Sequence, residues 1–130
     1  MSLTVRFFIF VCLSGMVACS GSPATTTHKL SSGRTIRVIS VGTMNFQESG
    51  PALMLSYQTD LKLDDMPALR NEVIEIWADF QKDATNANVG STVIMANEIP
   101  SGRIIQSGKA NNFVFTRNPD GTWPKEPLKQ

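Results

Sequence analysis

The chain has 130 residues, of which 12 are basic and 11 acidic, so its formal net charge is +1. This length suits one domain, and the near-neutral charge provides no basic surface of the kind that binds nucleic acids or anionic lipids. Both cysteines, Cys12 and Cys19, precede the predicted folded body. A disulfide framework, a thiolate nucleophile and a cysteine-ligated zinc site are therefore excluded for that body.

The N-terminus has the pattern of an export signal. Arg6 precedes a mostly apolar run over residues 7–18, which is far shorter than the roughly 20 residues that a membrane-spanning helix needs. A basic start, a short apolar run and small residues at its end are typical of a secretory signal peptide. We therefore predict that residues 1–18 are a signal peptide.

The end of this leader carries a more specific motif, Met16-Val17-Ala18-Cys19. It resembles the lipobox of bacterial lipoproteins, in which a Leu-like residue, a small residue and Gly or Ala precede a modified cysteine; Met16 departs from the preferred Leu. The resemblance implies cleavage before Cys19, a diacylglycerol on its sulfur and a third acyl chain, such as palmitate, on its amino group. With Ser20 following, it implies an anchor in the outer membrane that faces the periplasm.

Two alternatives to lipidation at Cys19 stay open. The leader could be an ordinary signal peptide cleaved after Ala18, or a buried N-terminal helix with an incidental cysteine. A lone exposed thiol in an oxidising compartment is a liability, which favours the lipoprotein interpretation. The body of the chain is similar only in general character to small uncharacterised lipoproteins of Gram-negative bacteria.

Residues 19–33 are rich in Ser, Thr, Gly and Pro, a composition that predicts a flexible tether lipidated at Cys19. Leu30 is its only large apolar residue and cannot form a core alone. The only histidine, His28, falls in this segment. Since a catalytic base or metal ligand needs a partner held in place, we expect neither role for it.

Two stretches at 34–43 and 52–63 alternate apolar and polar residues, which predicts two strands. In the first, Ile36 and Val38 share one face, and the other face carries Arg37, Ile39 and Val41. In the second, the core face consists of Leu53, Leu55, Tyr57, Thr59 and Leu61. Their alternation is typical of an antiparallel sheet with one solvated face.

The period then changes to that of a helix over about residues 67–86. Six apolar residues fall on one stripe: Leu69, Val73, Ile76, Trp77, Phe80 and Ala84. Asp64 or Asp65 can cap the first turn, where Pro67 is tolerated. The acidic residues that follow, from Glu72 to Asp83, are expected on the solvated faces.

The remaining chain predicts more strands, at 91–98, 103–107 and in a hairpin over 113–123. The hairpin turns at Asn118-Pro119-Asp120-Gly121, and Trp123 begins its return strand. Residues 34–124 should thus form a single α+β domain, an antiparallel sheet of four or five strands with one long amphipathic helix across one face. Residues 125–130 are a polar tail. The predicted core consists of Leu53, Leu55, Tyr57, Trp77, Phe80, Phe113 and Phe115.

The polar stretch at 96–103 is the best candidate for contact with a partner, because binding residues concentrate on loops of a rigid scaffold. Its candidate residues are Asn97, Glu98, Ser101 and Arg103. A plain structural turn is the alternative. Ser101 has no histidine or cysteine nearby, so a conventional hydrolase site is not expected.

The acidic residues Asp60, Asp64 and Asp65 lack the spacing of an EF-hand. We therefore predict no catalytic residue, no metal and no cofactor. The leading hypothesis is a lipid-anchored, non-enzymatic envelope domain that binds or supports another envelope protein. Alternatives are an inhibitor or immunity protein against an envelope hydrolase, an enzyme with a cryptic carboxylate- or Ser-based site, and a purely structural accessory.

Overall fold

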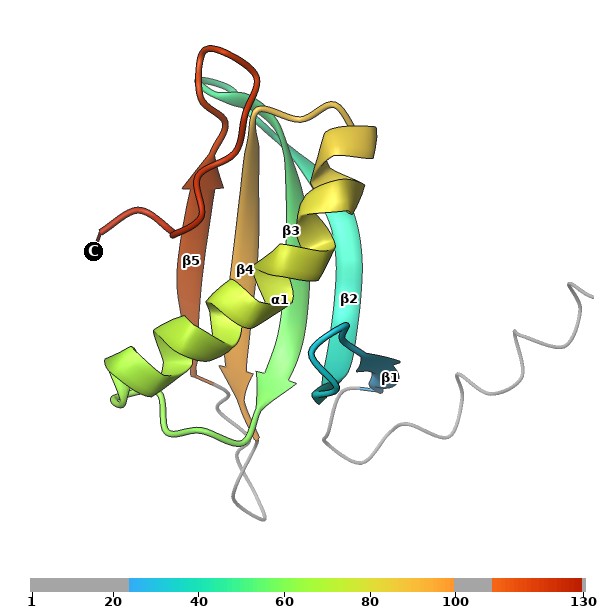
Figure 1. The fold of residues 1–130 in the computed structure, drawn as a ribbon, viewed down its shortest axis with the longest axis vertical. Coiled ribbons are helices and arrows are strands. Elements are labelled where there is room, and N and C mark those ends of the chain that lie inside the picture. The colour runs from blue at the N-terminus through green and yellow to red at the C-terminus, as the bar shows by residue number, and fades with distance from the viewer. Residues whose placement is uncertain (1–23, 100–108, 130) are drawn as a thin grey trace, which may run out of the picture.

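The computed structural model describes residues 24–99 and 109–129. In this part of the chain a five-stranded sheet carries one helix across one face, which confirms the predicted α+β class (Figure 1). The elements are β1 Thr26–Lys29, β2 Thr35–Phe46, β3 Gly50–Thr59, α1 Met66–Asn86, β4 Ser91–Glu98 and β5 Ala110–Thr116. The order of strands in the sheet follows their order in the sequence.

The prediction of a purely antiparallel sheet is wrong, because β3 and β4 pair in parallel. The other three strand pairs are antiparallel. The reason lies in the connection between β3 and β4. The 21-residue α1 spans about 31 Å, enough to return the chain along the whole length of the 10-residue β3. Such a crossover brings the next strand in with the same direction as the last.

The helix matches its prediction closely. Asp65 is the N-cap, and its side chain accepts a hydrogen bond from the backbone N–H of Ala68. Pro67 occupies the first turn, where its missing N–H has no helical partner. All six residues of the predicted apolar stripe are buried against the sheet.

The core lies between α1 and the facing side of the sheet, and all seven predicted core residues are buried. Its centre is Trp77, whose ring stacks on Phe115 with centroids 4.2 Å apart. Trp123 meets the same ring edge-on at 5.2 Å. Stacked and edge-to-face pairs of this kind add to the free energy gained from burial.

The ordered body begins earlier than predicted. β1 lies inside the segment 19–33 that was expected to be a tether, and it pairs with the start of β2. Leu30, which directly follows β1, is only 3% exposed and belongs to the core. A tight turn returns the chain, with Gly33 at φ +95° and its N–H bonded to the carbonyl of Leu30. One apolar anchor and a strand pairing thus order a stretch whose composition alone suggests a linker.

β2 is longer than predicted, and its alternation is interrupted. The register between β2 and β3 shifts between Val38 and Ser40, which marks a bulge. Val41 consequently pairs with Leu55 and shares the helix-facing side of the sheet with it. The prediction that Val41 and Val38 lie on opposite faces of the sheet is therefore wrong.

The C-terminal segment departs from a hairpin. The turn at Asn118–Gly121 is confirmed by the bond from the N–H of Gly121 to the carbonyl of Asn118. No return strand follows it in the described chain; instead Trp123 packs on α1, and its indole N–H donates to Thr85 Oγ1. The backbone N–H of Leu128 donates to the carbonyl of Val114, so the predicted polar tail runs beside β5.

Three predictions fall outside the described residues: the signal peptide 1–18, Cys19 with its lipobox, and the strand at 103–107. Within the described residues, α1 is too polar to serve as a membrane span.

Candidate functional site

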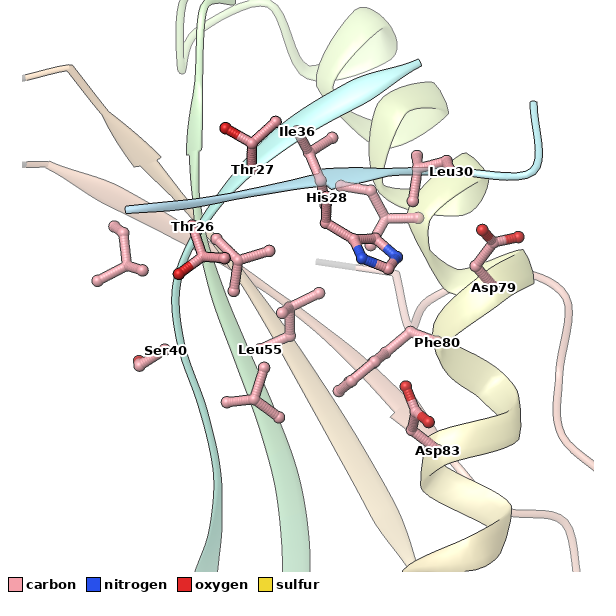
Figure 2. Close-up of a pocket in the computed structure, with 14 residues that line it drawn as sticks. Thr26, Thr27, His28, Leu30, Ile36, Ser40, Leu55, Asp79, Phe80 and Asp83 are labelled. Atoms are coloured by element: carbon pink, nitrogen blue, oxygen red, sulfur yellow. The ribbon is translucent and has the colours of Figure 1, made fainter. Parts of the chain in front are cut away.

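A groove of about 420 Å³ opens between α1 and the β1–β2 edge of the sheet. Its apolar lining comes from three separate parts of the chain: Leu30, Ile36, Val38, Ile39, Val41, Leu55, Ile76 and Phe80. Figure 2 shows Phe80 reaching from α1 toward Leu55 across this space. A concave apolar surface with a few polar groups on its rim is the usual form of a ligand-binding site.

The rim of this groove is polar and mainly acidic on the helix side. Asp79 and Asp83 project from consecutive turns of α1, and His28 points from β1 toward the helix (Figure 2). Residues four apart on a helix lie on the same face. The groove thus combines an apolar floor with two carboxylates along one wall.

Asp79 also holds the hairpin that closes one end of the groove. Its Oδ2 accepts a hydrogen bond of 2.7 Å from the backbone N–H of Ser31. This bond is the main cause that lowers the pKa of Asp79, with smaller contributions from the Ser31 hydroxyl and from the charges of His28 and Lys82. Asp83 has no ion pair with any described residue, so its charge is free to face a ligand.

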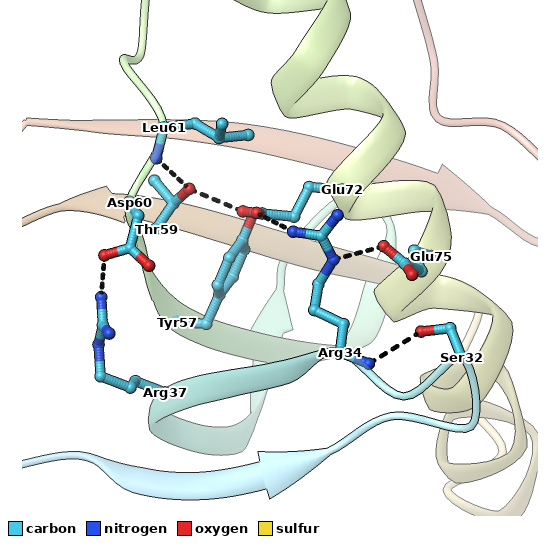
Figure 3. Close-up of polar contacts among 9 residues, drawn as sticks. All are labelled: Ser32, Arg34, Arg37, Tyr57, Thr59, Asp60, Leu61, Glu72 and Glu75. Carbon is cyan, nitrogen blue, oxygen red and sulfur yellow. Dashed lines mark hydrogen bonds and ion pairs between the residues drawn. The ribbon is translucent and has the colours of Figure 1, made fainter.

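A second polar group, centred on Glu72, lies beneath the other half of the helix (Figure 3). Glu72 was expected on a solvated face, but it is only 7% exposed. Its Oε1 accepts hydrogen bonds from the hydroxyls of Tyr57 and Thr59, at 2.8 and 2.7 Å. Its Oε2 pairs with Arg34 at 3.2 Å, and Arg34 also pairs with Glu75 at 2.6 Å.

This Glu72 cluster is internally satisfied. Both carboxylate oxygens have partners, which is what a buried charge requires. Burial, followed by the charge of Glu72, raises the pKa of Tyr57 well above its usual range. The phenol therefore stays protonated, and its O–H donates a hydrogen bond to the carboxylate of Glu72. The geometry therefore ties β3, α1 and the start of β2 together.

The structure describes only part of the predicted partner-contacting loop. Asn97 and Glu98 end β4, whereas Ser101 and Arg103 lie outside the described residues. The Asn97 amide donates to Ser56 Oγ at 2.7 Å and to the carbonyl of Tyr57 at 3.0 Å. The side chain of Asn97 thus holds β4 to β3.

The three neighbouring aspartates have separate roles. Asp65 caps α1, and Asp60 pairs with Arg37 at 2.6 Å. Asp64 is exposed. In the described ranges, no three His, Cys, Asp or Glu side chains gather in a way that would hold a metal ion.

Comparison with known proteins does not place the chain in a family: no protein-family model, curated protein or solved structure matches it. The groove is therefore the main guide to function. Sequence reasoning missed it because its first wall, residues 26–30, reads as part of a tether. The run of three threonines before His28 was the available signal, since β-branched residues favour strands.

Proposed function

We propose that this protein is a lipid-anchored, non-enzymatic binding domain of the bacterial cell envelope, and that its binding site is the groove between α1 and the β1–β2 edge. The observation that carries the proposal is the apolar lining of this groove, in which Val38, Ile39 and Val41 stay accessible beside the buried floor. Exposed apolar surface on a small domain costs free energy unless a ligand covers it at least part of the time.

The anchor rests on the resemblance of Met16–Cys19 to a lipobox, and the position of β1 adds a geometric consequence. The chain between Cys19 and Thr26, where β1 begins, spans at most about 25 Å. Thr26, Thr27 and His28 line the groove. A lipid on Cys19 would hold the groove close to the membrane surface, with little freedom to move away from it.

A binding role is favoured over an enzyme by what the buried polar groups do. A cryptic carboxylate site would use Glu72, the one buried acid among the described residues. Both oxygens of Glu72 are engaged by Tyr57, Thr59 and Arg34, and general acid–base catalysis needs a carboxyl group that can reach a substrate. The Glu72 cluster instead supports the fold by joining α1 to β3 and to Arg34.

The anchor is tested by labelling cells with an alkyne analogue of palmitate. We expect label on the wild-type protein and none on Cys19→Ser, because the thiol is the acylated group in the proposed anchor. Fractionation should place the wild-type protein in the outer membrane. Equal label on both proteins, or on neither, would refute the anchor.

The binding site is tested by placing a photo-crosslinking amino acid at Thr26, which is exposed and pairs with Val38 on the helix-facing side of the sheet, in living cells. A matched control places the same group at the exposed Asp64, far from the groove. We expect a discrete crosslinked product from position 26 only. Identical products from both positions would contradict the assignment of the groove as the binding site.

A further inference from the structure

The outer edge of β2 has an unusual feature beyond the point where β1 ends. β1 covers β2 only as far as Val38. In the next eight residues, 39–46, Ile39 forms the bulge and Ser40–Phe46 pair with β3 on one side alone among the described residues. An unpaired edge presents a row of backbone N–H and C=O groups that can accept another strand.

Natural proteins protect such edges with charged side chains or proline. The segment 39–46, ISVGTMNF, contains neither. It instead exposes Val41, Met44 and Phe46, which are 55%, 49% and 42% accessible. Backbone and side chains of this segment are thus both suited to contact with another polypeptide.

The groove adjoins the first part of this edge. Ile39, Ser40 and Val41 belong to its lining, and α1 forms the opposite wall with Phe80, Asp79 and Asp83. A strand added beside β2 would direct every second side chain toward the helix-facing side of the sheet, into the apolar groove. Hydrogen bonds from the edge would supply affinity, and the groove would select the side chains.

We propose that the groove and the free edge of β2 together bind an extended segment of another envelope protein as an added strand, with apolar residues facing the groove and a basic residue facing Asp79 and Asp83. This inference rests on the proposed binding function. The charge of the wall defines the basic residue, because Asp83 has no ion pair within the described residues and opposite charges across an interface set specificity.

Two other occupants fit the charges and sequence less well. A second copy that paired through its own β2 edge would bring no basic residue to the two aspartates, since 39–46 contains none. The residues that precede β1 include Gly21, Ser22 and Pro23; they offer no large apolar side chain, and proline has no N–H to donate.

The probe is a synthetic peptide about nine residues long, enough to span the eight residues of the edge. It alternates valine with threonine and carries arginine in place of the central valine. The full-length protein is reconstituted in lipid nanodiscs. We expect amide hydrogen exchange in the segment 39–46 to slow by at least about tenfold when the peptide is bound, with little change in β5.

Variants at exposed positions separate the contribution of the β2 edge to peptide binding from that of the acidic wall, and they keep the fold. Val41→Lys places a charge on the edge and should weaken binding at least about tenfold. Asp83→Asn should weaken the arginine peptide about three- to fivefold, as expected for an exposed ion pair, and leave a peptide with the central valine unchanged. The control Asp64→Asn should bind both peptides as wild type does.

Backbone N-methylation of alternate peptide residues should abolish binding, because it removes the donors that pair with the edge. The inference is overturned if the methylated peptide binds equally well, or if the peptide protects amides outside 39–46. It is also overturned if 39–46 is protected without peptide and dilution of the protein removes this protection, because that result identifies a second copy as the occupant. A groove-specific crosslink in cells without strand addition would overturn this inference but leave the proposed function standing. Strand addition by the peptide without that crosslink in cells would refute the proposed function and with it the partner from the envelope, and would leave only the ability of the β2 edge to accept a strand.

Discussion

Two buried threonines on neighbouring strands provide a sharp test of the energetics in this core. Thr92 lies on β4, level with Leu53 on one side and Phe115 on the other. It is fully buried, and its hydroxyl has no hydrogen-bond partner within the described residues. Thr59 at the end of β3 is 2% exposed, but its hydroxyl donates to Glu72 and accepts from the N–H of Leu61.

Replacement of each threonine by valine preserves the shape of the side chain and removes the hydroxyl. A buried hydroxyl without a partner costs about 1–3 kcal/mol. We therefore expect Thr92→Val to raise the free energy of unfolding by about 1 kcal/mol and the melting temperature by about 4–8 °C. Thr59→Val removes a hydrogen bond to a carboxylate, so it should lower the free energy of unfolding by about 1.5–3 kcal/mol.

The assay is thermal and urea unfolding of the two variants and the wild type, followed by far-UV circular dichroism at one pH and protein concentration. The m-value in urea should stay constant, which shows that the compactness of the unfolded state is unchanged. The reasoning fails if Thr92→Val destabilises the protein, or if the two variants shift its stability in the same direction.

Four further variants test other parts of the fold. Trp77→Ala should lower the free energy of unfolding by about 3–5 kcal/mol, measured as the urea midpoint; an unchanged midpoint would mean that Trp77 does not pack in the core. Arg34→Ala, which leaves the buried Glu72 without its ion pair, should cost about 1–2 kcal/mol, whereas Arg37→Ala, which breaks an exposed pair, should cost less than about 1 kcal/mol; equal losses would contradict the role given to Glu72. Asp79 has a pKa lowered in the folded state, so its contribution to stability is present above its ordinary value of 3.8 and is lost as the pH falls through the lowered value. Stability measured between neutral pH and about pH 2 should fall less steeply in acid for Asp79→Asn than for wild type, and parallel curves would refute this.

The parts of the fold that the sequence predicts well are those with a strong period. The apolar stripe from Leu69 to Ala84 fixes the helix and its buried face, and both are as expected. The same stripe contained a signal that was misread. Glu72 is three residues after Leu69 and four before Ile76, which places it on the apolar face. Its charge suggested solvent, but Tyr57, Thr59 and Arg34 satisfy it inside the protein.

The parallel direction of the β3–β4 pair could have been predicted from a physical argument. Two strands joined by a helix long enough to cross the sheet pair in parallel when they are neighbours, as β3 and β4 do. Alternation along β3 obscured this, because it is typical of antiparallel sheets with a solvated face. In this domain the alternation arises because α1 is the one helix that covers the described sheet, and it lies on one face.

The groove was not predictable from local pattern, since its walls come from β1, the bulged part of β2 and the second half of α1. Only tertiary contacts bring these segments together. A consequence follows for binding and stability. The groove floor, with Leu30, Ile36 and Phe80, belongs to the core cluster, so changes there should affect folding and binding together. Val41 lies outside that cluster and is largely exposed, and Asp83 forms no ion pair with the described residues. The edge and the acidic wall are therefore the places where binding can change while the stability of the domain is kept.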